Sequence, residues 1–371
     1  MQVVGVEQFG GPEALAVHEV PEPHAGSGSV RIRVAAFAVN PTDTGVRAGQ
    51  RDSSEASPPY VPGMDAAGVI DEVGPDVSGW SVGDEVMAIA LPLSTHGGAY
   101  VQELVAPVGS FTRVPRGVSL EAASTVPMNG LTALQILSRA GLTPGRTLAV
   151  TGAAGLLGNY VVQLARAEGL TVIADAAPAD EALVRSLGPD HVVPRGSGFA
   201  AAVRALVPEG VDALADAAVQ RSEVVDAVQD GECSSTCGGG PGRLAGIRFE
   251  QVMVFSEYRS FDKLEQLRHA VESGTITPGS PRCCLRRGRA RRTSGSRRAG
   301  RAVASCSPGV REHGDERAWC VSTAVCAGRD RDQGPSGGAS SAGGVPPGRL
   351  LVASGRDLDH GGALSRRRRP G

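Results

Sequence analysis

Small residues fill a short stretch near the middle of the chain, between an apolar run and a helical pattern. The stretch reads Gly152, Ala153, Ala154, Gly155, Leu156, Leu157 and Gly158. Residues 148–151 before it suit a strand buried on both faces, and residues 159–168 carry apolar side chains at helical spacing. Small residues let the backbone approach a pyrophosphate, and a helix N-terminus offers that anion unpaired N–H groups. The stretch therefore predicts a turn that binds a dinucleotide.

A second apolar run, residues 170–174, leads to an acidic residue. This residue, Asp175, lies about 20 residues beyond the turn, where a dinucleotide site has its ribose contact. The turn differs from the common G-x-G-x-x-G pattern, because Ala153 stands at the first glycine position. The alternative is an ordinary tight turn that binds nothing. Strand, turn, helix and acidic residue in this order favour the dinucleotide site.

The composition indicates a globular chain without a strong charge field. The chain has 371 residues, 41% of them hydrophobic, and a formal net charge of −2. This length predicts two domains, and the charge argues against nucleic-acid and membrane partners. No apolar stretch is long enough to cross a bilayer, and residues 1–10 lack the pattern of a signal peptide. We therefore expect a cytoplasmic protein.

Strand patterns dominate the first part of the chain. Residues 30–34 alternate strictly between apolar and basic side chains, as a half-buried strand does. Glycine and proline interrupt the chain often up to about residue 114, which suggests a compact β domain. From Ser119, a predicted helix N-cap, helical and strand patterns alternate as far as residue 216. The sequence therefore predicts an α/β fold with a doubly wound parallel sheet.

Several motifs together resemble one family. They are Asn40-Pro41-Thr42-Asp43, Pro62-Gly63-Met64-Asp65-Ala66-Ala67-Gly68, Gly83-Asp84-Glu85-Val86, Gly130-Leu131-Thr132-Ala133 and the Ala-Ala-Gly turn. With them, about residues 1–278, apart from one patch, resemble the quinone oxidoreductase branch of the medium-chain dehydrogenases. The resemblance implies a GroES-like β domain, a Rossmann cofactor domain, a small-molecule substrate and a homodimer.

The resemblance also implies the domain limits and the activity. We expect a GroES-like catalytic domain in residues 1–118, a Rossmann domain in 119–255, a helical return segment in 256–278 and a disordered tail in 279–371. The implied reaction is hydride transfer from a nicotinamide to a quinone or an α,β-unsaturated carbonyl. The alternatives are a reductase of enals or enoyl thioesters, and a nucleotide-binding protein without turnover.

Two features of the sequence point to different nucleotides. An acidic residue at Asp175 favours the free ribose of NADH and repels the 2′-phosphate of NADPH. Arg185 does not replace it, because this residue falls in the middle of the following helical pattern. The resemblance favours NADPH. NADPH is therefore the expected cofactor, with NADH as the alternative.

The same resemblance predicts a site without zinc. Zinc-dependent relatives place a cysteine ligand near the position of Asn40 and a histidine near Met64, and this sequence has neither. Asp43, Asp65 and His96 would be a poor set of zinc ligands, because they offer two carboxylates and one histidine but no thiolate. No metal is expected.

Hydride transfer needs hydrogen-bond donors where charge develops on the acceptor oxygen. The resemblance places Asn40 and Thr132 near the nicotinamide, and Tyr60 could donate a phenolic proton. Each has an alternative: Asn40 could belong to a plain Asn-Pro turn, Thr132 could bond its own helix backbone, and Tyr60 could only pack. Asp65 is expected to accept backbone N–H bonds beneath the site, in a structural role.

Two segments depart from the family pattern. Residues 232–242 lack the apolar run of the fifth parallel strand that belongs there, and residues 279–371 are rich in arginine and glycine without periodicity. The return of the chain to the catalytic domain is missing from the second segment. All seven cysteines lie at or after Cys233. We hypothesise that both segments are frame-shifted, and translation of the DNA in the other frames tests this. A basic tail that binds anionic surfaces is the alternative.

Overall fold

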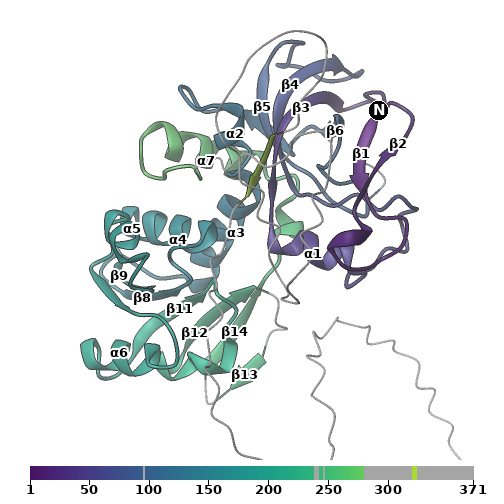
Figure 1. The fold of residues 1–371 in the computed structure, drawn as a ribbon. Helices are drawn as coiled ribbons and strands as arrows, with labels where there is room; N and C mark the ends of the chain where they lie inside the picture. Colours follow the sequence, from purple (N-terminus) through teal and green to yellow (C-terminus); the bar gives the residue numbers. More distant parts are fainter. Residues whose placement is uncertain (95–96, 238–241, 245–246, 280–319, 324–371) are drawn as a thin grey trace, which may run out of the picture. The chain divides into compact units, whose positions relative to one another are not determined.

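The computed structural model describes residues 1–94, 97–237, 242–244, 247–279 and 320–323 (Figure 1). The chain divides into two units, Met1–Asp330 and Arg331–Gly371, and every described residue belongs to the first. Within the described residues, no helix is both long and apolar enough to cross a membrane.

The first part of the chain builds an antiparallel β domain. A hairpin of β1 (Gln2–Gly5) and β2 (Ala16–Glu19) precedes a six-stranded sheet in the order β15-β3-β4-β5-β7, with β6 also paired to β3. The strands are β3 Ser29–Val39, β4 Asp65–Val73, β5 Glu85–Ile89, β6 Glu103–Pro107, β7 Phe111–Arg113 and β15 Cys320–Thr323. The predicted alternation in β3 is confirmed, because Val30 and Ile32 are buried and Arg33 is exposed.

The strand β15 corrects one expectation. The sequence indicated that the chain does not return to the first domain after residue 278, yet β15 pairs in parallel with the second half of β3, from Cys320 opposite Ala36 to Thr323 opposite Val39. Ladder hydrogen bonds use backbone groups, so this pairing does not need the apolar run that the sequence pattern requires. The rest of the expected disordered tail beyond Gly279 lies outside the described residues.

The second part builds a seven-stranded sheet in the order β10-β9-β8-β11-β12-β14-β13 (Figure 1). Its strands are β8 Thr147–Thr151, β9 Thr171–Ala176, β10 His191–Pro194, β11 Val211–Asp216, β12 Val228–Cys237, β13 Gly242–Leu244 and β14 Ile247–Val252. All neighbours are parallel except β13 and β14. The predicted parallel sheet is therefore confirmed, and the strand order reverses between β8 and β11.

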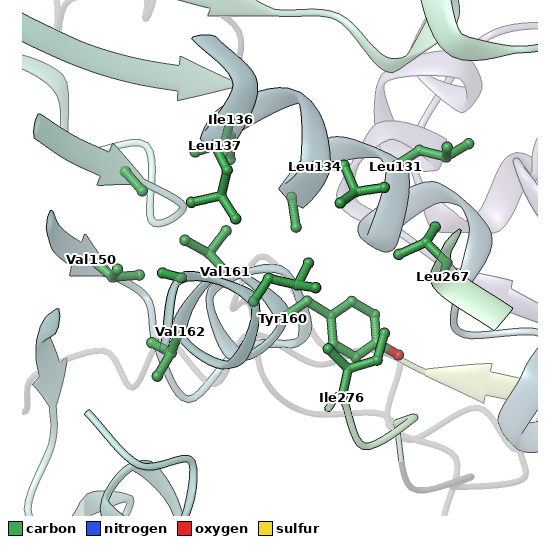
Figure 2. Packing of buried hydrophobic residues seen from close by; sticks show 14 of the residues in the cluster. Leu131, Leu134, Ile136, Leu137, Val150, Tyr160, Val161, Val162, Leu267 and Ile276 are labelled. Atoms are coloured by element: carbon green, nitrogen blue, oxygen red, sulfur yellow. The ribbon is translucent and has the colours of Figure 1, made fainter. Parts of the chain in front are cut away.

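Helices cover both faces of this sheet, as a doubly wound fold requires. One apolar cluster joins α3 (Pro127–Ala140), α4 (Leu156–Ala167) and α7 (Phe261–Glu272) to one face, and α5 (Glu181–Ser186) adds Val184 to it. A separate cluster joins α6 (Phe199–Leu206) to the other face. Figure 2 shows Leu134 and Leu137 of α3 and Tyr160 and Val161 of α4 in the first cluster. The helix predicted over residues 261–272 is confirmed as α7.

Shorter helices complete the described chain. They are α1 (Pro41–Arg47), α2 (Leu120–Ala123) and the 3₁₀ helices η1 (Pro12–Ala14), η2 (Arg221–Glu223), η3 (Val225–Ala227) and η4 (Val254–Glu257). Ser119 caps α2, because its hydroxyl accepts the N–H of Ala122 at 3.3 Å. This confirms the predicted N-cap.

The fifth parallel strand, which the family pattern puts in this part of the chain, is present as β12 up to Cys237 although its apolar run is missing. The strand β12 lies between β11 and β14, with Cys233 opposite Ala213 and Arg248. Two parallel neighbours offer backbone partners on both edges, which can hold a strand that lacks an apolar run. The frame-shift hypothesis concerns the origin of these residues and stays a prediction.

Candidate functional site

The glycine turn lies at the carboxyl end of β8, the strand at which the sheet order reverses. The helix α4 begins at Leu156, so the turn spans Gly152–Gly155 and is shorter than the predicted stretch to Gly158. Gly152 has a φ of +68°, and a side chain there would stand 3.1 Å from the backbone nitrogen of Ala218. A methyl group at Gly158 would lie 2.3 Å from the carbonyl oxygen of Gly152. These close approaches explain the small residues, and ligands of such sheets bind in the crevice at this reversal.

The neighbouring loop after β11 is held against the turn by Asp216. One carboxylate oxygen of Asp216 accepts the hydroxyl of Thr151 at 2.7 Å, and the other accepts the backbone N–H of Arg221 at 2.7 Å. Val219 in this loop has a φ of +57°, a strained backbone for a β-branched residue. Asp216 therefore ties the carboxyl ends of β8 and β11 together at the edge where a dinucleotide is expected.

Asp175 lies next to last in β9, directly beside the turn. Its carboxylate accepts the backbone N–H of Ala153 at 3.0 Å and the Nε of Arg195 at 3.1 Å. The Asp175 side chain is 1% exposed. The ribose role predicted for Asp175 stays a prediction, whereas its contact with the turn is direct.

The sequence reasoning missed Arg195. This residue follows the last residue of β10, and its backbone N–H donates to the carbonyl of Ala176 at 3.0 Å. The parallel register places Val193 opposite Asp175, so the chain brings Arg195 to the same edge. A basic residue directly after the segment that forms β10 was the signal in the sequence that could have found it.

A second polar cluster lies where the first domain meets α3. Asn40 is the N-cap of α1, and its backbone N–H donates to Asp43 at 2.8 Å, so the predicted Asn-Pro turn is the start of a helix. The Asn40 amide donates to Asp65 at 2.7 Å and accepts from the Asn129 amide at 2.8 Å. Asn40 is 1% exposed. The structure therefore fixes this amide by hydrogen bonds on both sides, and Asn129 is a partner that the sequence did not reveal.

Two buried carboxylates support this cluster. Asp43 accepts from the backbone of Gly63 at 3.2 Å and from the Tyr100 hydroxyl at 2.9 Å, and Asp65 accepts the N–H of Met128 at 2.6 Å. The expectation that Asp65 accepts backbone N–H bonds is confirmed. Burial raises the pKa of Asp43 to about 6 and that of Asp65 to about 8, although these hydrogen bonds act in the opposite direction.

The other predicted site residues have different surroundings. The Thr132 hydroxyl donates to the Met128 carbonyl at 2.7 Å, which is the backbone-bonded alternative for this residue. The Tyr60 ring stacks on Phe9 with centroids 4.4 Å apart, and its backbone pairs with Val6. The structure thus joins Asn40 to α3, and it gives Tyr60 a packing contact in the N-terminal part of the domain.

The described residues provide no obvious metal site. No group of three or more histidine, cysteine, aspartate or glutamate side chains in the described ranges could hold a metal ion. The sulfur of Met64 accepts the Thr42 hydroxyl at 3.8 Å. His96 lies outside the described residues.

Comparisons with known proteins match both parts of the fold. A model of the alcohol dehydrogenase GroES-like domain matches residues 26–117. The chain is similar to a 2-haloacrylate reductase of a Burkholderia species, at 34% identity over 57% of this chain and 64% of the relative. It is also similar to the chloroplastic quinone oxidoreductase QR1 of Triphysaria versicolor, at 32% identity over 58% of this chain and 67% of the relative.

Solved structures share the fold. Mycobacterial Rv1454c complexed with NADPH has a TM-score of 0.65 at 28% identity, covering 75% of this chain and 90% of that one. An NAD-dependent alcohol dehydrogenase has a TM-score of 0.67 at 27% identity, covering 75% and 91%. The chain spans about half to two thirds of the length of the curated relatives it matches.

Proposed function

Because the chain belongs to the quinone oxidoreductase branch of the medium-chain dehydrogenases, we propose that it is an NAD(P)H-dependent reductase of a quinone or an α,β-unsaturated carbonyl. One observation carries the proposal: the glycine turn and the Asn40 cluster are joined through α3 and α4. The Tyr160 hydroxyl in the first turns of α4 lies 3.3 Å from the Thr125 hydroxyl, just before α3. Asn129 at the start of α3 reaches Asn40.

The turn and α4 supply the nucleotide end of the proposed site. Gly152 and the start of α4 would hold the pyrophosphate by close backbone approach and by the N–H groups of the helix N-terminus. Asp175 keeps the turn in place through Ala153. A bound nicotinamide dinucleotide would supply the hydride. The chain would hold the nicotinamide ring close to the acceptor carbon and in the right orientation.

The Asn40 cluster supplies the acceptor end. Negative charge develops on the acceptor oxygen, and preorganised donors stabilise it. Each side-chain amide has two N–H donors, and the hydrogen bonds described use one from Asn40 and one from Asn129. We infer that a remaining amide N–H faces the acceptor oxygen. Asp65 holds Asn40 in this orientation, so Asp65 is a positioning residue.

We also infer that the reaction does not use zinc. The resemblance implies that zinc-dependent relatives have a thiolate near the position of Asn40 and an imidazole near that of Met64, and this chain has neither. Asp43 and Asp65 accept N–H and O–H donors from the protein, and neutral amides replace a Lewis acid at the acceptor oxygen. Thr132 and Tyr60 remain candidates for further contacts near the nicotinamide.

Among the activated alkenes, 2-haloacrylates are a specific candidate acceptor, because one relative is a 2-haloacrylate reductase. The test is nucleotide consumption by the purified chain with quinones, enals and 2-haloacrylates. We expect turnover with at least one class, and Asn40→Ala should lower it while nucleotide binding stays unchanged. Nucleotide binding without consumption across the panel would contradict the reductase and support a binding protein without turnover.

A further inference from the structure

The edge beside the glycine turn carries an ion pair that the proposed reaction does not use. We propose that Arg195 selects the nucleotide with a 2′-phosphate, NADPH over NADH, and that Asp175 positions Arg195 for this role. The inference rests on the proposed function only in that the site binds a nicotinamide dinucleotide. It concerns which dinucleotide binds, and not what the enzyme reduces.

The first step is that Asp175 is not available as an NADH-selecting acid. Such a residue accepts the ribose hydroxyls with its carboxylate. Both carboxylate oxygens of Asp175 already accept protein donors, one from Ala153 and one from Arg195, and the side chain is 1% exposed. The acid is therefore turned toward the turn and away from solvent.

The second step is that Arg195 is fixed through its Nε while part of its side chain stays exposed. Its Nε donates to Asp175 at 3.1 Å, while 25% of the side chain is exposed. A guanidinium has five N–H donors in a fixed planar fork, and the fork suits a phosphate. The pairing with Asp175 fixes the plane of the fork, so less freedom is lost when a phosphate binds.

The third step is that Arg195 lies at the end of β9, where the ribose is expected. Arg195 is bonded through its backbone to Ala176, the last residue of β9, and the ribose is expected at the end of this strand. Besides Asp175, the carboxylate of Asp180 also faces this guanidinium: it is 4.0 Å from an Nη of Arg195, and its side chain is 28% exposed. Asp180 therefore weakens the attraction to a phosphate, and removing its charge should strengthen it.

The test measures dissociation constants by calorimetry for NADPH, NADH, 2′,5′-ADP and 5′-AMP. The double variant D175S/R195A removes the ion pair together, so that no buried carboxylate stays unpaired, and Ser can still accept the Ala153 N–H. We expect it to weaken NADPH and 2′,5′-ADP by about 10- to 100-fold, as for loss of a charged hydrogen bond, and to change NADH and 5′-AMP by less than about threefold.

Three further variants sharpen the result. Arg195→Lys keeps the charge without the fork, and should recover part of the NADPH affinity. Asp180→Asn should tighten NADPH and 2′,5′-ADP by about two- to fivefold, and leave NADH unchanged. Arg185→Ala is the matched control, because this exposed arginine pairs with Glu181 along α5 and should change nothing.

The outcomes separate this inference from the proposed function. Equal loss of NADPH and NADH in the double variant, or preference of the native chain for NADH, overturns the role of Arg195 and leaves the reductase proposal intact. NADPH preference that depends on Arg195, without turnover of any acceptor, supports the inference and contradicts the reductase. No binding of either nucleotide overturns both.

Discussion

Two buried carboxylates at opposite ends of the proposed site differ in their partners. Asp175 at the nucleotide end accepts a backbone N–H and pairs with the guanidinium of Arg195. Asp65 at the acceptor end accepts a backbone N–H and the neutral amide of Asn40. A charged partner compensates a buried carboxylate directly, whereas neutral donors do so only in part, and burial raises the pKa of Asp65 to about 8. The nucleotide end therefore holds a charged pair, whereas the acceptor end holds an amide in a fixed orientation.

The substitution that should destabilise the protein most is at the acceptor end. Asp65→Ala removes the acceptor of both the Met128 N–H and the Asn40 amide in a fully buried place. We expect the free energy of unfolding to fall by about 2–5 kcal/mol, since each buried unpaired donor costs about 1–3 kcal/mol. Urea unfolding measures it. Asp175→Ala should cost less because Arg195 reaches water, and the exposed Glu55→Ala should cost nothing measurable.

The next effect separates chemistry from binding. Asn40→Ala should lower turnover by about 10- to 100-fold, because a donor to the developing oxyanion is lost. The dissociation constant of the nucleotide should stay within about threefold, since Asn40 belongs to the acceptor end. Steady-state kinetics with calorimetry checks both. A variant that loses nucleotide binding and turnover together would contradict the division into two ends.

A third prediction concerns pH and stability. Asp65 has its ordinary pKa near 4 in the unfolded chain and about 8 in the folded one. Below pH about 4 the Asp65 carboxyl is protonated in both the folded and the unfolded chain, so the contribution of the neutral carboxyl to folding stability is fully present. Between about 4 and 8 only the folded state keeps the proton, so stability falls as pH rises, on the order of 1 kcal/mol per pH unit.

The measurement is urea unfolding across this pH range for the native chain and for Asp65→Asn, which cannot titrate. We expect a shallower pH dependence in the variant, with the remaining slope below about pH 6 coming from Asp43, whose pKa is also raised. An unchanged slope would show that Asp65 is ionised at all these pH values in the folded chain.

The smallest effect concerns Tyr60. Tyr60→Phe keeps the stack on Phe9 and removes only the hydroxyl, so turnover should stay within about threefold. Tyr60→Ala serves as the comparison, because it removes the packing as well and should lower the unfolding temperature. Loss of turnover in Tyr60→Phe as large as that in Tyr60→Ala would instead assign a proton-donor role to the phenol.

Features that depend on neighbouring residues could be predicted from the sequence. The alternation of Val30, Arg31, Ile32 and Arg33 predicted β3, and apolar spacing predicted the bounds of α7. The strand, small-residue turn and helix predicted the nucleotide edge, although the helix begins at Leu156 inside the expected turn. Local spacing suffices here because strand and helix periods are properties of the backbone.

The contacts between distant groups, in contrast, follow from the packing of the folded chain. Asn40 lies at the start of α1 and Asn129 in α3, 89 residues further along the chain, and Arg195 reaches Asp175 through the register of β10 against β9. The strand β12 forms where no apolar run predicted one, because β11 and β14 offer backbone partners on both edges. The spacing of residues in the sequence does not give the distance in space between segments that are far apart in the chain. Packing of α3 on α4 and the parallel ladder set those distances, and with them the partners of each buried carboxylate.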